Sequence, residues 1–204
     1  MNPTDVPTSP TDASSLVLPD AAKDIRRVVI ATDDGDDELA RVRRVALALA
    51  RTHGFEVVLY DRSNERWTDH PHPQGPLTAD QLAGGDELEG GNREHLVRQL
   101  REFEVEGVSA SAWLATVPAL TAMLDVVQAM DVDAVMLPDR LDDPKIMDRL
   151  QVGGTPGEML ERITARSVAD APLILTVPES GPITVVEYSE SGLGDEPETH
   201  GATR

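Results

Sequence analysis

Apolar and polar positions along this chain form two alternating patterns. Short continuous apolar runs, rich in β-branched residues, have the length and composition of buried parallel strands. Between them, apolar residues recur every three or four positions, the spacing of a helix that buries one face. The runs predict strands at residues 28–32, 55–60, 108–116, 134–137 and 173–177. The periodic segments predict helices at residues 37–53, 93–106, 118–130 and 157–169.

Strands and helices thus alternate along the chain. This order predicts an α/β fold, an open five-stranded parallel sheet with helices on both faces and right-handed crossovers. Residues 183–188 alternate weakly, which leaves a sixth, edge strand open. Residues 61–92 are polar and rich in Pro and Gly, and a segment of this length is typical of a functional lid or a mobile loop.

The composition divides the chain into three parts. Residues 1–24 are rich in Pro, Thr, Ser and Asp and are predicted to be a disordered tail, with residues 16–18 as the one apolar spot, which could pack locally. Residues 25–180 form the predicted α/β domain. Residues 181–204 comprise the candidate edge strand and then an acidic tail, also predicted to be disordered.

The net charge is −19, which argues against nucleic acid and anionic membranes as partners, since both require clustered Lys and Arg. No apolar run approaches the length of a membrane span, and the first residues lack the pattern of a signal peptide. The chain has no cysteine, so thiol catalysis and disulfides are excluded. We therefore expect a cytoplasmic protein.

The candidate ligand site lies where the first strand ends. Ligands of open α/β sheets bind outside the carboxyl ends of the strands. Thr32 ends the first predicted strand and Asp33 follows it, so a small-molecule site should include both. The alternative is that Asp33 only closes the turn between strand and helix.

Three stretches carry a resemblance to a known family. They are residues 28–35 (VVIATDDG), residues 116–137 with TVPA at the start and DVDAVML at the end, and residues 171–178 (APLILTVP). In this order they resemble the universal stress protein family, over residues 26–178. The resemblance implies the strand order 3-2-1-4-5, frequent homodimers and, in one subgroup, ATP bound between strands one and four.

In that subgroup the Asp after strand one contacts the nucleoside, and a loop of pattern G-x2-G-x9-G-[ST] after strand four holds the phosphates. Pro138 and Leu141 stand at the first two glycine positions here. Proline has no N–H to donate, and leucine carries a side chain where the backbone must approach phosphate closely. The ligand contacts suggested by this comparison are Thr32, Asp33, Arg140, Gly153, Gly154 and Thr155.

Other candidate chemistry is weaker. The segment Asp69-His70-Pro71-His72 does not have the spacing of known zinc sites, and the acidic residues after Asp33 suit a helix start better than a cation site. No G-x-S-x-G, P-loop or G-x-G-x-x-G pattern is present, so we predict no catalytic residue and no metal.

The leading hypothesis is a non-enzymatic stress-response or regulatory protein of the universal stress type. It would form a homodimer through its last strand, bind an unidentified protein partner or ligand, and bind ATP weakly or not at all. The rival is a slow ATP hydrolase of the related adenine-nucleotide superfamily, with Arg140 and the segment Gly153-Gly154-Thr155 at the phosphates. A third hypothesis is a module that only dimerises.

Overall fold

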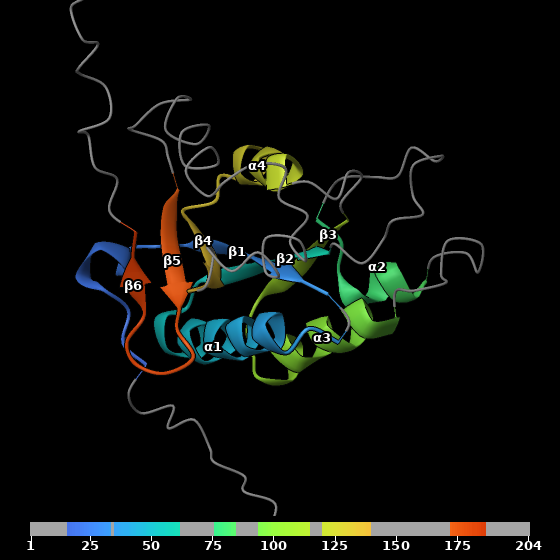
Figure 1. The fold of residues 1–204 in the computed structure, drawn as a ribbon. Coiled ribbons are helices and arrows are strands. Elements are labelled where there is room, and N and C mark those ends of the chain that lie inside the picture. Colours follow the sequence, from blue (N-terminus) through green and yellow to red (C-terminus); the bar gives the residue numbers. More distant parts are fainter. Residues whose placement is uncertain are drawn as a thin grey trace, which may run out of the picture.

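The computed structural model describes residues 16–33, 35–61, 76–84, 94–114, 120–139 and 172–186. Figure 1 shows its helices and strands in place. The helices are a 3₁₀ turn at Asp20–Ala22, α1 at Asp37–His53, α2 at Ala79–Ala83, α3 at Glu94–Val105 and α4 at Leu120–Ala129. The strands are β1 at Arg27–Thr32, β2 at Glu56–Asp61, β3 at Ala110–Leu114, β4 at Ala134–Pro138, β5 at Leu173–Val177 and β6 at Thr184–Val185.

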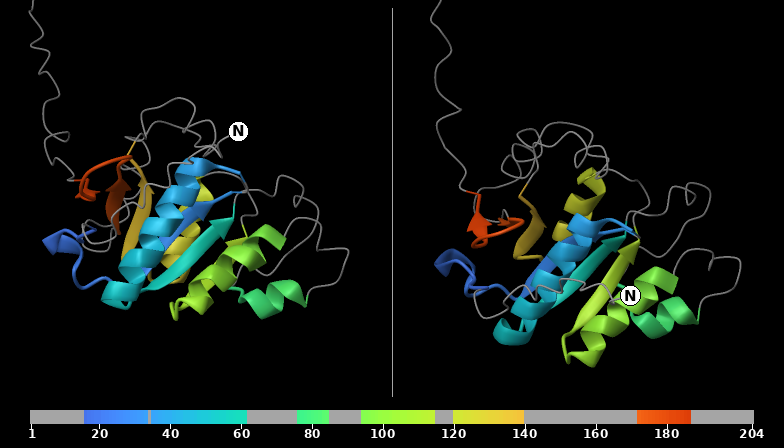
Figure 2. Two further views of the ribbon diagram at one scale, coloured as in Figure 1. Left: turned by 90° about the horizontal axis from the view of Figure 1, so that it is seen from below. Right: turned by 60° about the horizontal axis from the view of Figure 1, so that its bottom comes forward.

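The strands form one sheet of order β3-β2-β1-β4-β5-β6. The first five are parallel and β6 is antiparallel to β5, so the predicted α/β fold and the order 3-2-1-4-5 are confirmed. Helices α1 and α3 cover one face of the sheet, α2 packs against α3 beside the edge strand β3, and α4 lies on the other face (Figures 1 and 2). The sixth strand is present at Thr184–Val185, and residues 187 and 188 of the predicted segment lie outside the described residues. The predicted helix at residues 157–169 lies outside the described residues.

The core has two apolar layers because successive strand residues face opposite sides of the sheet. Along β1, Val28 and Ile30 pack beneath α1 and α3, whereas Val29 and Ala31 pack beneath α4. The four residues are at most 2% exposed. A central strand covered on both faces explains why this stretch reads as a continuous apolar run.

Helix α1 begins directly after the turn that follows β1. The carboxylate of Asp36 caps its first turn by accepting hydrogen bonds from the backbone N–H groups of Glu38 (3.0 Å) and Leu39 (3.2 Å). Gly54, with a φ of 79°, ends the helix in the left-handed conformation. The Asp36 cap therefore determines where the chain turns from β1 into α1 at the carboxyl edge of the sheet.

The packed part of the chain begins earlier than the composition suggested. Leu18 is 1% exposed and Ala22 is fully buried, and both belong to the same apolar cluster as Ile183 next to β6. Residues 16–24 thus pack against the domain, because a few spaced apolar side chains suffice to dock a segment whose average composition is polar. Residues 1–15 lie outside the described residues.

Both edges of the parallel sheet carry a short antiparallel partner. Leu77 exchanges two backbone hydrogen bonds of 2.8 Å with Ala112 of β3, and β6 pairs with β5 at the other edge. Leu77 belongs to the segment 61–92, whose described part also forms α2 with a capping box between Thr78 and Gln81. This part of the segment therefore covers a sheet edge.

Candidate functional site

The order of the strands creates a topological switch point beside β1. The chain runs from β1 to β2 and β3 in one direction and returns to β4 and β5 in the other. Open α/β sheets bind ligands in the crevice outside the carboxyl ends at such a point. The register pairs residues 28–30 of β1 with residues 134–136 of β4. If this register continues for two more residues, Thr32 lies opposite Pro138. Asp33 and Asp139, the next residues of the two strands, then lie at the same edge of the sheet.

Thr32 is directed away from solvent. It is fully buried, and its hydroxyl oxygen donates to Oε1 of Gln99 on α3 over 2.6 Å. Its hydroxyl is therefore committed to the interior, which does not favour the ligand contact predicted for this side chain. Asp33, one residue later, is partly exposed at the switch point.

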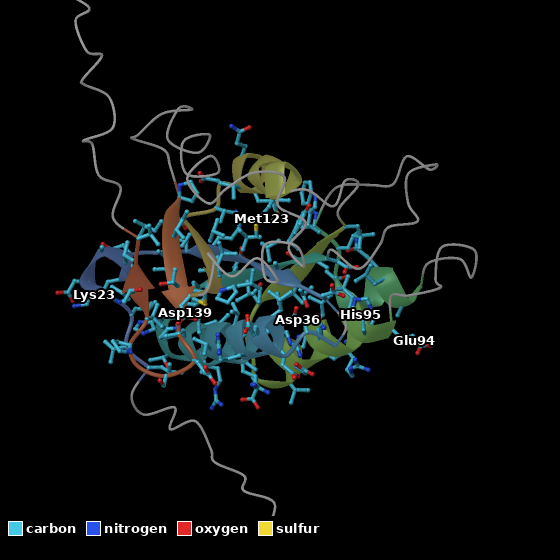
Figure 3. The ribbon with its side chains drawn as sticks, in the orientation of Figure 1. Lys23, Asp36, Glu94, His95, Met123 and Asp139 are labelled. Carbon is cyan, nitrogen blue, oxygen red and sulfur yellow. The ribbon has the colours of Figure 1, made fainter. Side chains whose placement is uncertain are left out.

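Four buried polar side chains lie between the sheet and α3, and we call Thr32, Asp61, His95 and Gln99 the buried polar layer. Asp61 ends β2 and pairs in register with Thr32. Its Oδ1 lies 3.5 Å from Nε2 of His95, and the two side chains are 3% and 6% exposed. His95 is labelled in Figure 3, where it lies on α3.

Buried polar groups are stable only when they are hydrogen-bonded or paired. The contacts of Gln99 with Thr32 and of His95 with Asp61 therefore hold α3 at the carboxyl ends of β1 and β2. The sequence interpretation missed it. The signal was present, since His95 and Gln99 fall four residues apart within the apolar stripe formed by Leu96, Leu100 and Phe103. Among the described residues no group of three or more His, Cys, Asp or Glu side chains is arranged to hold a metal ion.

A second polar cluster lies at the carboxyl ends of β4 and β5. Arg41 of α1 donates from Nη2 to the carbonyl oxygen of Val177 over 3.2 Å, and the same nitrogen lies 3.6 Å from Oδ1 of Asp139. The backbone N–H of Asp139 donates to the same Val177 carbonyl over 3.2 Å. Asp139 and Asp36 are labelled in Figure 3, at the same side of the sheet. The sequence carried no local signal for this cluster, since its members come from three separate elements.

Two atoms of this region lack partners. Nε of Arg41 and Oε2 of Glu38, three residues earlier on α1, are buried and make no hydrogen bond with the described part of the chain. Such atoms are uncommon in folded proteins and call for an explanation such as a water, an ion or a ligand.

The remaining predicted contacts cannot be placed. Arg140, Gly153, Gly154 and Thr155 lie outside the described residues, as do Leu141 and the segment Asp69–His72. Their parts in a phosphate or metal site therefore stay predictions. No helix within the described ranges is long and apolar enough to cross a membrane.

Fold and site together define an open α/β protein with a candidate ligand site at the switch point between β1 and β4. Neither a protein-family model nor a curated protein matches this chain. The solved structures that are similar to it include several universal stress proteins, the family that the sequence resembles.

A universal stress protein family member from Burkholderia pseudomallei is 15% identical, with a TM-score of 0.43 over 76% of this chain and 96% of that chain. The universal stress protein from Archaeoglobus fulgidus in complex with dAMP is 21% identical, with a TM-score of 0.38 over 64% and 94%. A family protein from Arabidopsis thaliana with AMP bound is 14% identical, with a TM-score of 0.40 over 76% and 92%. At these identities and TM-scores the matches assign no role to any residue of this chain.

Proposed function

We propose that this chain is a regulatory or stress-response protein of the universal stress type that forms a homodimer and binds ATP weakly or not at all. The observation that carries the proposal is the arrangement at the end of β4. There the N–H of Asp139 and the guanidinium of Arg41 both donate to the carbonyl of Val177. Two donors that could receive a phosphate at this edge, the N–H of Asp139 and Nη2 of Arg41, are therefore already engaged, whereas Nε of Arg41 is not.

Phosphate binding at a sheet edge requires available N–H groups and positive charge. Pro138 has no N–H, and the next amide along the chain is bonded to Val177. The carboxylate of Asp139 adds negative charge beside Arg41, and Asp33 and Asp36 add more across the switch point. These features disfavour a triphosphate without closing the site to other ligands.

The test is a titration of the full chain with ATP, AMP and cyclic AMP by isothermal calorimetry. We expect no saturation below about 1 mM, which corresponds to less than about 4 kcal/mol of binding free energy. A micromolar dissociation constant for any of the three would contradict the proposal. ATP turnover abolished by both Asp33→Ala and Gly154→Asp would support the rival hydrolase instead.

The homodimer is tested separately by native mass spectrometry of the purified chain, which also reports any retained nucleotide. The dimer would form through the last strand, because β6 pairs with β5 on one side and is an outermost strand of the described sheet. Weak self-association has dissociation constants of roughly tens of micromolar. If the protein is a monomer at a concentration in this range, the homodimer part of the proposal is wrong.

A further inference from the structure

Arg41 reaches from the second turn of α1 over the carboxyl ends of β4 and β5. Its side chain is 20% exposed and that of its partner Asp139 is 34% exposed. The contact joins α1 to the end of β4, next to the switch point. Arg41 thus brings a largely buried positive charge to the carboxyl edge of the sheet, where a ligand's negative charge could meet it.

The hydrogen-bonding capacity of Arg41 is only partly used. A guanidinium has five N–H donors, and here Nη2 donates to Val177 while Nε has no partner in the described part of the chain. The distance of 3.6 Å to Asp139 exceeds the roughly 2.7–2.9 Å of a charge-assisted hydrogen bond. The two side chains are thus paired electrostatically without a direct hydrogen bond, so a better acceptor could compete.

We propose that Asp139 determines the ligand specificity of the switch-point site by occupying Arg41 in place of a ligand's phosphate. In the native chain the site then accepts ligands without a phosphate or other anionic group. The proposal rests on the proposed function, because it names the residue responsible for weak ATP binding. It also makes a separate claim, that neutralising this one carboxylate makes Arg41 available to an anion.

Asp139→Asn is the sharpest change, since it keeps the shape of the side chain and removes only its charge. The backbone bond from Asp139 to Val177 and the bond from Arg41 to Val177 do not involve this carboxylate, so both should remain. A phosphate could then take two parallel N–H donors of the guanidinium, the arrangement in which arginine binds such groups best.

The experiment measures ATP and pyrophosphate binding by calorimetry at low salt for the full chain, Asp139→Asn, and Asp139→Asn combined with Arg41→Gln. Glu102→Gln is the matched control, because it removes the same charge from a carboxylate that pairs with another arginine of α1, Arg43, at 3.3 Å. We expect Asp139→Asn to tighten binding at least about tenfold relative to the native chain and the control. The gain should disappear in the double variant and shrink at 1 M salt.

An unchanged affinity in Asp139→Asn, an equal gain in Glu102→Gln, or a gain that persists without Arg41 would each overturn the inference. Circular dichroism of each variant checks the fold, and Asp139→Ser replaces Asp139→Asn if that protein does not fold. The proposed function fails on a different result, micromolar ATP binding by the native chain, so the two are tested independently.

Discussion

Arg26 and Asp133, 107 residues apart, are joined by two hydrogen bonds at the amino edge of the sheet. The backbone N–H of Arg26 donates to Oδ2 of Asp133 over 2.8 Å, and its Nη2 donates to Oδ1 over 3.2 Å. The N–H of Arg27 donates to the same Oδ2 over 2.9 Å. Asp133 thereby holds the start of β1 against the start of β4, directly opposite the switch point.

Burial raises the pKa of Asp133, but the two backbone N–H groups and the guanidinium of Arg26 outweigh it and hold the pKa below the usual value of 3.8. A carboxylate with a lowered folded-state pKa contributes stability above its unfolded-state pKa, about 3.9. This contribution is lost as the pH falls through the folded-state pKa. Asp133 therefore contributes to stability at neutral pH and ceases to do so in strong acid.

We expect Asp133→Asn to lower the free energy of unfolding by about 1–3 kcal/mol at pH 7, because two backbone donors lose a charged acceptor. Urea unfolding at pH 7 and in strong acid, below the folded-state pKa of Asp133, measures the effect, and the difference in unfolding free energy from the native chain should narrow in acid. The control is Asp131→Asn. Asp131 also contacts Arg26, its side chain is 88% exposed, and asparagine tolerates its φ of 51°. An equal loss in both variants, or a loss independent of pH, would contradict this account.

The bond between Thr32 and Gln99 predicts a coupling energy. Gln99→Leu leaves the buried hydroxyl of Thr32 without its acceptor and should cost about 1–3 kcal/mol of unfolding free energy. Thr32→Val in the same chain removes the unpaired group, so the double variant should lose less than the sum of the single losses. A double-mutant cycle by urea denaturation measures the coupling. Strictly additive losses would show that the two side chains do not depend on each other.

Docking of the segment before β1 is tested by a neighbouring pair of residues. Leu18→Ala removes a side chain that is 1% exposed and should cost about 2–5 kcal/mol of unfolding free energy. Val17→Ala, at a side chain that is 67% exposed, is the control and should change stability by less than about 0.5 kcal/mol. Thermal and urea unfolding provide the measurement. If both variants matched the native chain, the prediction of a tail over residues 16–24 would be restored.

The position of β6 on the edge of β5 predicts that β6 prevents β5 from pairing with strands of other chains. A chain ending after Ser180 lacks β6 and exposes the edge of β5, including the carbonyl of Ile174 that now accepts the N–H of Val186 over 2.9 Å. An open apolar edge strand pairs with other chains. We therefore expect the sedimentation coefficient of the chain ending after Ser180 to rise with protein concentration. A chain ending after Val186 keeps β6 and is the matched control. Identical sedimentation of the two would show that β6 has no protective role.

Most of the fold could be predicted because its signals are local. The apolar run at residues 28–32 and the periodic segment at residues 37–53 correspond closely to β1 and α1, with Gly54 at the predicted end. Residues 16–24 carry a weaker local signal, because the apolar cluster that contains Leu18 and Ala22 is completed by residues distant in sequence, such as Phe55, Met136 and Ile183. The described part of residues 61–92 was not assigned any structure, since Leu77 pairs with a strand that comes later in the chain.

The sequence by itself determined where the five parallel strands and the helices α1, α3 and α4 lie, because strand and helix periodicities depend on neighbours a few positions apart. It also placed Asp33 at the end of the first strand. Only the tertiary structure decided what surrounds that position. It turned Thr32 towards Gln99, set Asp61 beside His95, and brought Arg41 to Asp139 across 98 residues of chain. These contacts join residues that are far apart in the sequence, and no local pattern predicts them. They arise only when the sheet and its helices pack together.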